Sequence, residues 1–454
     1  MKNKRIVVLL KYFKGELNPF DGAALECALE MGAREIIAVS MAPISALNAF
    51  QGLTRLGIKG VFVSDPLYAG SDTQATSFIL AETLKRLNPD LIFCGRQSVD
   101  GDTAQVPPML AQRLGFAIKT RVMGFEGENV KLRNGEIFVP QSKTVLTFEK
   151  IKTLRFPSIF SKLGEVDIWD NSVLQLPTEK CGLAGSPTRV MKSYESSVGR
   201  RNCQFVEVES LGSLIQKGLQ TAPSQPSQET GGKIDEVYFV GNIKEVAQSI
   251  AKRVYQVETA DKTAEMLAEE LQGKTVLWED SEELKVLASK VAVLCGAGLC
   301  ADCIAFRVEN GKVIMTRPAL GGNITADIVC EGNTAFATVR TVKKEGADVI
   351  FSVGKGAIEY IDQIAELAKK YNAEVCCSRI VADSGKLPYE KQVGLTGKTV
   401  CPKVYVAFGI SGAVQHTCAI AGAGMVIAVN TDKQARIFDY ADYGIGTEVK
   451  NVKL

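Results

Sequence analysis

The sequence predicts an α/β fold built from several doubly wound parallel sheets. Its first hundred residues alternate short apolar runs with stretches of helical periodicity, and a similar alternation returns near residue 348. Runs rich in Val, Ile and Leu are typical of strands buried on both faces of a parallel sheet. Repeated strand–helix units place such strands side by side. Because 454 residues exceed what one core accommodates, we expect two or three domains.

The first expected domain has four buried strands separated by helices. The strands are expected at 4–10, 35–41, 60–65 and 90–96, and the helices at 22–31, 44–57 and 75–88. Residues from about 120 to 190 look irregular, with short strands such as 143–150. "APSQPSQETGG" (222–232) has the Pro-, Ser- and Gly-rich composition of a linker. Strands at 236–241 and 274–280 begin the second half.

The last α/β unit has ligand-competent residues after each expected strand. A helix is expected at 358–372, and strands at 348–354, 373–379, 403–412 and 425–432. Ligands of open parallel sheets bind outside the carboxyl ends of the strands. The residues found there are Gly354, Lys355, Gly356, Ser378, Arg379, Gly409, Ser411, Gly412, Asn430 and Asp432. Together they predict a nucleotide-type site.

The only histidine, His416, lies in the glycine-rich stretch "GISGAVQHTCA" (409–419) and is expected in the first or second turn of a helix. A single histidine excludes a multi-histidine metal site, and Ser–His or Cys–His catalysis would have to use it. One interpretation is a partly buried histidine with satisfied hydrogen bonds. The other is an imidazole that stabilises negative charge beside a redox cofactor.

Composition excludes several classes of protein. A net charge of +2 gives no field that would indicate nucleic-acid or membrane binding. No apolar run approaches the length of a membrane span, so we expect a cytoplasmic protein. Cys295, Cys300 and Cys303, with Cys330 further on, have the spacing of a plant-type [2Fe–2S] protein. Buried apolar thiols are the alternative, and we assign no metal site.

Long motifs resemble the electron transfer flavoproteins. "SRIVADSG", "QVGLTGKTVCPKVYVAFGISGAVQH", "IAVNTD" and "ADYGIG" resemble the FAD-binding domain of the alpha subunit. "NPFDGAALECAL", "AGSDTQATS", "CGRQSVDGDTAQVPPMLAQRLG" and "GLAGSPTRV" resemble the beta subunit. The resemblance implies a beta subunit fused ahead of an alpha subunit. The implied domains are beta-like 1–221, linker 222–232, a shortened alpha N-terminal-like domain 233–345 and an FAD-binding domain 346–454.

The resemblance implies FAD in the last domain. Arg379, Thr396 and His416 would set its potential, with Arg379 and His416 supplying positive charge. The implied FAD-binding residues are Lys355, Ser378, Arg379, Val393, Gly394, Leu395, Thr396, Ser411, Gly412, Ala413, Val414, Gln415, His416, Asn430 and Glu448. Leu395 departs from the family, which usually has glutamine there.

A second nucleotide, AMP or FAD, is implied in the beta-like half. Its residues would be Asn18, Phe20, Asp21, Met41, Asp72, Thr73, Thr76, Gly95, Asp100, Asp102, Thr103, Ala104, Gln105 and Val106. "AGSDTQATS" and "DGDTAQV" are similar to the electron-bifurcating branch, which favours FAD. The segment between Lys11 and Asn18 is shorter than in the family, so a hairpin near this site is expected to be missing. Pro107 replaces a common glycine.

The implied function is an electron carrier that uses FAD. It would accept electrons from a dehydrogenase, such as an acyl-CoA dehydrogenase-like flavoenzyme, and pass them to a second partner. The loop 154–162 aligns with the partner-docking loop of the beta subunit, which implies docking through Ile159. The alternative is that Ile159 folds back on the core. Two other functions stay open: a bifurcating protein with two FAD that oxidises NADH, and a non-redox module that binds adenine nucleotides. Either a monomer or a homodimer is expected.

Overall fold

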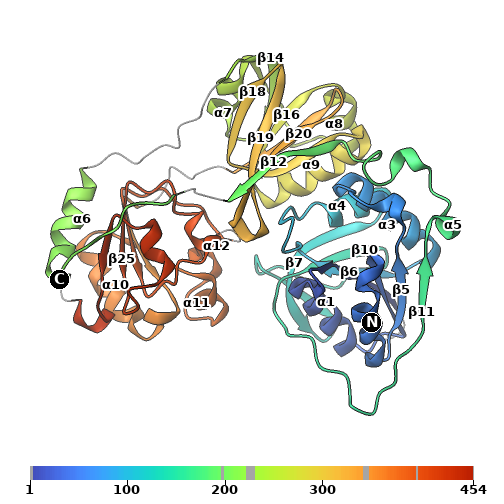
Figure 1. Cartoon of the computed structure of the whole chain (residues 1–454), viewed down its shortest axis with the longest axis horizontal. Helices are drawn as coiled ribbons and strands as arrows, with labels where there is room; N and C mark the ends of the chain where they lie inside the picture. Colours follow the sequence, from blue (N-terminus) through green and yellow to red (C-terminus); the bar gives the residue numbers. More distant parts are fainter. Residues whose placement is uncertain (1–3, 196–198, 221–230, 341–346, 395–396, 453–454) are drawn as a thin grey trace. The chain divides into compact units, whose positions relative to one another are not determined.

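The structure is a computed structural model that describes residues 4–195, 199–220, 231–340, 347–394 and 397–452. The chain forms two compact units, shown in Figure 1. The first comprises Met1–Ser193, Thr230–Leu320 and Ala326–Arg340, and the second Tyr194–Glu229, Gly321–Thr325 and Thr341–Leu454. Of the linker expected at 222–232, only Gly231 and Gly232 lie among the described residues. No helix in the described ranges is long and apolar enough to cross a membrane.

A nine-stranded sheet forms the N-terminal part of the first unit, in the order β11-β5-β4-β1-β6-β10-β7-β8-β9. Only the β7–β8 and β8–β9 pairs are antiparallel. The strands are β1 Arg5–Leu9, β4 Glu35–Met41, β5 Lys59–Val63, β6 Leu91–Gly95, β7 Ala117–Glu126, β8 Asn129–Leu132, β9 Ile137–Phe138, β10 Thr144–Phe148 and β11 Val166–Trp169. The four strands expected in the first hundred residues are confirmed.

Helices cover both faces of this sheet because alternate side chains of its strands are apolar on both sides. In β1, Ile6 and Val8 pack in one core with α1 and α2, whereas Val7 and Leu9 pack in a second core with α3 and α4. These helices are α1 Pro19–Glu30, α2 Leu47–Gly52, α3 Thr73–Leu87 and α4 Val106–Leu114. The helix expected at 44–57 is divided, since 3-10 turns at Ile44–Ala46 and Leu53–Leu56 flank α2.

The expectation of a missing hairpin near Asn18 is wrong. A minimal one is present, formed by β2 (Tyr12–Phe13) and β3 (Glu16–Leu17). Lys14 and Gly15 make its turn, both with positive φ (51° and 82°), which is the backbone that a two-residue hairpin turn requires. The shortened segment therefore retains the element in its smallest form.

A second parallel sheet belongs to the same unit, in the order β15-β14-β16-β21-β17. It is joined to the N-terminal part through helices α4 and α9 and through the buried Gln74. The Gln74 amide donates to the carbonyls of Ala292 (2.7 Å) and Ala297 (2.9 Å). The elements are β14 Ile234–Val240, α7 Lys244–Ile250, β15 Ala251–Gln256, α8 Ala264–Leu271, β16 Thr275–Glu279, α9 Glu282–Cys295, β17 Gly298–Cys303 and β21 Ala335–Val339. A four-stranded sheet consists of β12 Thr188–Glu195, β20 Ile324–Cys330, β19 Lys312–Ala319 and β18 Ala305–Glu309.

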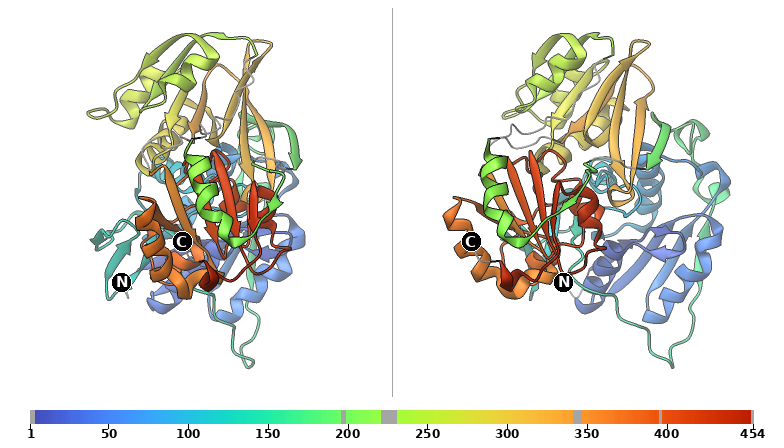
Figure 2. Two further views of the ribbon diagram at one scale, coloured as in Figure 1. Left: turned by 90° about the vertical axis from the view of Figure 1, so that its left-hand side faces the viewer. Right: turned by 60° about the vertical axis from the view of Figure 1, so that its left-hand side comes forward.

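The second unit is a six-stranded parallel sheet in the order β13-β26-β25-β24-β22-β23. Helices α6 and α10 cover one face, where Leu211, Ile215 and Ile364 pack on β22 and β24. Both views in Figure 2 show the green α6 lying against the orange and red sheet. The elements are β13 Gln204–Phe205, α6 Leu211–Leu219, β22 Val349–Val353, α10 Ile361–Lys370, β23 Glu374–Cys377, α11 Arg379–Asp383, β24 Val404–Phe408, α12 Val414–Thr417, β25 Met425–Val429 and β26 Tyr443–Ile445.

Candidate functional site

The carboxyl edge of the second unit's sheet brings the expected site residues together. The chain runs from β22 to β23 on one side and returns to β24 on the other, so the strand order reverses between β22 and β24. Open parallel sheets bind ligands at such a reversal. There Gly354 follows β22 and Gly409 follows β24, and a Cβ on Gly354 would lie 2.3 Å from the Gly409 carbonyl oxygen. Only glycine permits this approach.

The loop after β24 presents free backbone N–H groups. Those of Ser411, Gly412 and Ala413 have no acceptor among the described residues. Gly412 has φ 84°, and a Cβ there would lie 2.0 Å from the nitrogen of Ile437. Asn430, at the end of β25, donates from its amide to the carbonyl of Ile410 at 3.0 Å and so fixes the loop. Converging N–H groups of this kind suit a phosphate.

Residues 393–394 lie directly against residues 415–416. A Cβ on Gly394 would lie 3.0 Å from the Gln415 carbonyl oxygen and 3.8 Å from the His416 Cα. The Val393 N–H donates to the carbonyl of Cys377 at 2.8 Å, which joins this segment to the end of β23. Two segments that are distant in sequence thus form one wall. Leu395 and Thr396 lie outside the described residues.

His416 is the third residue of the four-residue helix α12, which confirms its expected place in a first helical turn. It is 6% exposed, and its Nε2 lies 2.8 Å from the Tyr405 hydroxyl. Burial lowers the pKa of His416 to about 4, and the backbone of Val393 opposes the shift only in part. The imidazole is therefore uncharged at neutral pH. Of the two residues expected to supply positive charge, only Arg379 carries one here.

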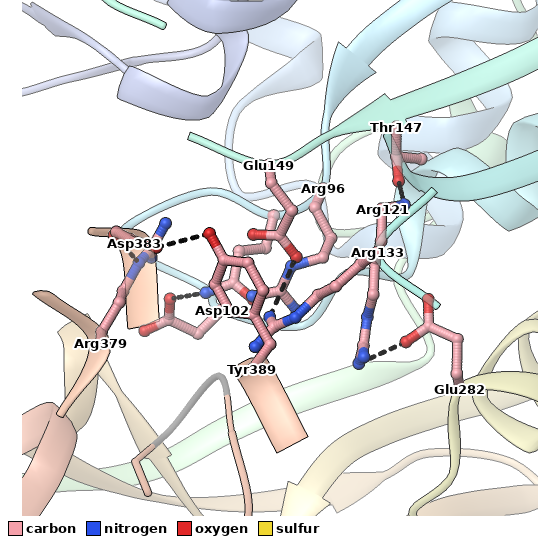
Figure 3. A network of polar contacts seen from close by, with 11 residues as sticks. Arg96, Asp102, Arg121, Arg133, Thr147, Glu149, Glu282, Arg379, Asp383 and Tyr389 are labelled. Carbon is pink, nitrogen blue, oxygen red and sulfur yellow. Dashed lines mark hydrogen bonds and ion pairs between the residues drawn. The ribbon is translucent and has the colours of Figure 1, made fainter. Parts of the chain in front are cut away.

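Arg379 begins helix α11 rather than ending a strand, because β23 stops at Cys377 and Ser378 precedes the helix. Its Nε donates to Asp383 at 3.3 Å, and the Tyr389 hydroxyl donates to the other oxygen of that carboxylate at 3.0 Å. Figure 3 shows these three side chains together. The guanidinium is about one-third exposed, so it is accessible to a ligand while one turn of helix holds it.

The remaining expected FAD residues lie along the same edge. Lys355 opens a 3-10 turn after β22, and Glu448 precedes a 3-10 turn after β26, where Lys450 pairs with it at 2.5 Å. Gln415 packs on Gly321, where a Cβ would lie 2.3 Å from the Gln415 Nε2.

The sequence did not point to the contact between Tyr405 and His416, because a tyrosine inside an apolar strand gives no sign of its hydrogen-bond partner.

In the N-terminal sheet the strand order also reverses, between β1 and β6. Asp21 links the segments that meet there. Its carboxylate accepts from the N–H groups of Lys11 and Gly95, each at 2.7 Å. Burial raises the pKa of Asp21 to about 6, although the hydrogen bonds from Lys11, Asn18 and Gly95 oppose the shift. A Cβ on Gly95 would lie 2.4 Å from the Asp21 carboxylate. Asp21 thus joins the end of β6 to the segment that follows β1.

The loop before α4 has the form of an anion-binding nest. Asp102 and Ala104 have left-handed backbones, with φ 53° and 54°, and Gln105 returns to the right-handed helical region. The N–H groups of Thr103, Ala104 and Gln105 have no acceptor within the part of the chain that the structure describes. Alternating backbone handedness points successive N–H groups into one concavity, which suits a phosphate. Pro107 is compatible with its place in the first turn of α4.

Several of the expected nucleotide residues make protein contacts with their side chains, Asp72, Thr73 and Gln105 among them. Asp72 caps α3 through the N–H groups of Gln74 and Ala75 and also accepts from Thr188. Thr73 donates to Gln105 at 2.9 Å. Of the others, Thr76 lies in the first turn of α3 and Met41 ends β4. The buried Oδ1 atoms of Asn18 and Asp100 have no hydrogen-bond partner among the described residues, so these acceptors are available to a ligand.

A buried ionic group beside this loop was not anticipated from the sequence. Glu149 lies 3.0 Å from Arg96 and 3.5 Å from Arg133 (Figure 3). The Arg96 guanidinium also stacks over Phe20. Arg96 and Glu149 directly follow β6 and β10. The rule that ligands gather at strand ends would have pointed to both residues.

The loop expected to dock a partner is anchored at its base and exposed at its tip. Arg55 donates to the carbonyls of Ser158 (2.9 Å) and Ser161 (3.2 Å), and Arg155 pairs with Glu26. Between them Ile159 is 84% exposed, so it is not folded back on the core. Its aromatic neighbours Phe156 and Phe160 are likewise exposed.

Three of the four cysteines with the ferredoxin-like spacing pack together as core residues. Cys300, Cys303 and Cys330 are buried in one apolar core of the first unit. Within the described ranges, no group of three or more His, Cys, Asp or Glu residues could hold a metal ion.

Both parallel-sheet edges present backbone N–H groups of the kind that suit a phosphate, and comparison with known proteins gives the family of the chain. The model of the electron transfer flavoprotein FAD-binding domain matches residues 344–421, and that of the electron transfer flavoprotein domain matches 6–137 and 245–365. The chain therefore belongs to the electron transfer flavoprotein family.

Each of the following relatives matches less than half of this chain. An electron transfer flavoprotein subunit alpha of Thermoanaerobacterium thermosaccharolyticum is 32% identical over 46% of this chain and 78% of its own length. A subunit beta of Clostridium acetobutylicum is 34% identical over 45% of this chain and 82% of its own. The acryloyl-CoA reductase electron transfer subunit beta of Anaerotignum propionicum is 38% identical over 31% of this chain, and the match spans only about half of that protein (52%).

The lowered pKa of His416 has a direct test, because the chain holds one histidine. In purified protein labelled with [¹³Cε1]-histidine, the single resonance should stay that of a neutral imidazole down to about pH 5 and titrate near pH 4. In urea-unfolded protein, the matched control, it should titrate near 6.5. Since the unfolded chain binds this proton more tightly, stability present above about pH 6.5 is lost as the pH falls through about 4. Titration of the folded protein near pH 6.5 would show that the imidazole is not buried in this way.

Proposed function

We propose that this chain is an electron transfer flavoprotein in which a beta-like and an alpha-like segment are fused. The proposal is supported by two matches to the same family domain in one chain, followed by the match to the FAD-binding domain. The division into 1–221, 222–232, 233–345 and 346–454 is part of this proposal. Bound FAD supplies reversible storage of one or two electrons.

The observation that best supports FAD at the second unit is the convergence of three segments at one strand reversal. The N–H groups of 411–413 suit the pyrophosphate, while Gly394 and His416 form a wall beside them. Arg379 supplies a positive charge, which favours the acceptance of an electron. His416, held by Tyr405, offers a neutral hydrogen-bonding group to the flavin edge. The roles that the resemblance implies for Leu395 and Thr396 are part of this proposal and fall outside the described residues.

Two variants test the proposal that Arg379 and His416 set the reduction potential of FAD. Arg379→Gln removes a charge and should lower the midpoint of the first one-electron step by on the order of 60 mV, about a tenfold change in the equilibrium constant. His416→Ala removes a neutral hydrogen-bonding group and should lower it by less. Lys369→Gln, an exposed residue of α10, is the control and should leave the midpoint unchanged. Potentiometric titration with equal FAD content measures all three, and an unchanged midpoint in Arg379→Gln would contradict this role.

We propose a dehydrogenase of the acyl-CoA class as the electron donor. The name of the Anaerotignum relative refers to acryloyl-CoA reductase, which supports this class of partner. The exposed apolar side chains of Phe156, Ile159 and Phe160 are presented on an anchored loop. Docking would therefore cost little conformational entropy. Central apolar side chains of this kind dominate binding energies.

The docking proposal predicts that Ile159→Asp reduces kcat/KM for flavin reduction by an acyl-CoA dehydrogenase at least about tenfold. The effect should appear mainly in KM, with FAD content unchanged. Ile137→Asp is a matched control because Ile137 is an exposed isoleucine of the same unit, on β9 and outside the loop. Equal losses in both variants would argue against docking through Ile159.

A second nucleotide in the beta-like segment is also proposed, either AMP or FAD. The nest at Thr103–Gln105 and the free acceptors of Asn18 and Asp100 support it. The sequence "DGDTAQV" favours FAD, and with it the alternative that the chain is a bifurcating protein that oxidises NADH.

The carrier and bifurcating proposals differ in their response to NADH. A carrier keeps its flavin absorbance when NADH is added anaerobically, whereas dithionite, the positive control, bleaches it. We expect no bleaching by NADH. Rapid bleaching together with two FAD per chain would replace the carrier proposal by the bifurcating one.

A further inference from the structure

The nucleotide loop of the beta-like segment is held in place by residues of the alpha-like segment. The Arg317 Nη2, from β19, donates to the Gly101 carbonyl at 2.7 Å. The Leu320 N–H donates to the Asp100 carbonyl at 3.1 Å, and the Gln105 amide donates to the Leu299 carbonyl at 3.1 Å. Three contacts from one segment therefore hold a loop that belongs to the other.

The loop needs such support because its backbone is strained. Left-handed backbones at residues other than glycine are unfavourable and persist only where the surroundings enforce them. Asp102 and Ala104 are two such residues within three positions. Within the beta-like segment, Lys11 pairs with the Asp100 carboxylate at 2.8 Å. The carbonyls of Asp100 and Gly101 are held from the alpha-like side.

Arg317 is suited to hold the loop firmly. It is 7% exposed, and a hydrogen bond from a charged donor is stronger than one from a neutral donor. A negative charge nearby comes from Asp302, whose own ion pair is with Lys285 at 2.6 Å. Burial alone would raise the pKa of Asp302, but the cations Lys285, Arg340 and Arg317 outweigh it and keep the carboxylate ionised.

We propose that Arg317 is a positioning residue for the second nucleotide. By holding the Gly101 carbonyl, it fixes the loop so that the N–H groups of Thr103, Ala104 and Gln105 converge on a phosphate. Arg317 does not contact the nucleotide in this proposal. The inference rests on the proposed second site and adds that the site is complete only when the alpha-like segment is in place.

The test compares full-length wild type with Arg317→Gln, Arg317→Lys and Arg86→Gln. Arg86 is the matched control because it also donates to two backbone carbonyls, those of Val173 and Leu174, away from the loop. Each protein is dialysed, its AMP and FAD are quantified after denaturation, and it is then titrated with AMP and with FAD. We expect Arg317→Gln to bind the second nucleotide at least about tenfold more weakly, with Arg317→Lys between it and wild type. FAD at the C-terminal domain should be unchanged in every variant.

A second measurement separates positioning from general destabilisation. Hydrogen–deuterium exchange of a peptide covering 98–106 should rise in Arg317→Gln and not in Arg86→Gln, whether or not nucleotide is bound. Wild-type affinity and exchange in Arg317→Gln would overturn the proposal. If wild type itself retains no second nucleotide and binds neither AMP nor FAD, the second site is absent. That result overturns the proposed function of the beta-like segment rather than the role of Arg317 alone.

Discussion

The convergence of parallel strand ends at a point of reversed strand order is the constraint on which both sites depend. Strands β22 and β24 bring Gly354 and Gly409 so close that neither position has room for a side chain. In the N-terminal sheet, Asp21 accepts from the N–H of Gly95, the last residue of β6, and from that of Lys11, two residues after β1. Each arrangement leaves the following loops to present free backbone N–H groups at the sheet edge, where a phosphate fits.

Burial determines which of the two residues at the proposed flavin site carries a charge. The Arg379 side chain is about one-third exposed and charged, whereas His416 is buried against Tyr405 and is neutral. A neutral imidazole tunes a cofactor through hydrogen bonding, while a guanidinium acts through charge. The site thus combines one fixed cation with one neutral group, instead of the two cations that the sequence suggested.

The sequence predicted most of the architecture because buried parallel strands have a strong apolar pattern. It also predicted the clustering of Gly409–Gly412, Asn430 and Arg379, since strand ends meet at one edge. It could not predict the charge state of His416, which depends on burial by residues distant in sequence. Nor could it predict that Arg317 reaches Gly101, because that requires knowledge of a tertiary contact. The cap that Asp72 makes on α3 is local, and Asp is a preferred N-cap residue, so this role could have been predicted from the sequence. The short hairpin at Tyr12–Leu17 was missed because a two-residue strand has no detectable periodicity.

We propose that one chain holds FAD at the edge of its C-terminal sheet and a second nucleotide at its N-terminal sheet. The most direct test is the visible spectrum of the purified protein, with FAD and AMP quantified per chain after denaturation. We expect a yellow protein with one FAD and one further nucleotide, either AMP or a second FAD. A colourless protein that takes up no FAD on reconstitution would contradict it and would favour a non-redox nucleotide-binding module.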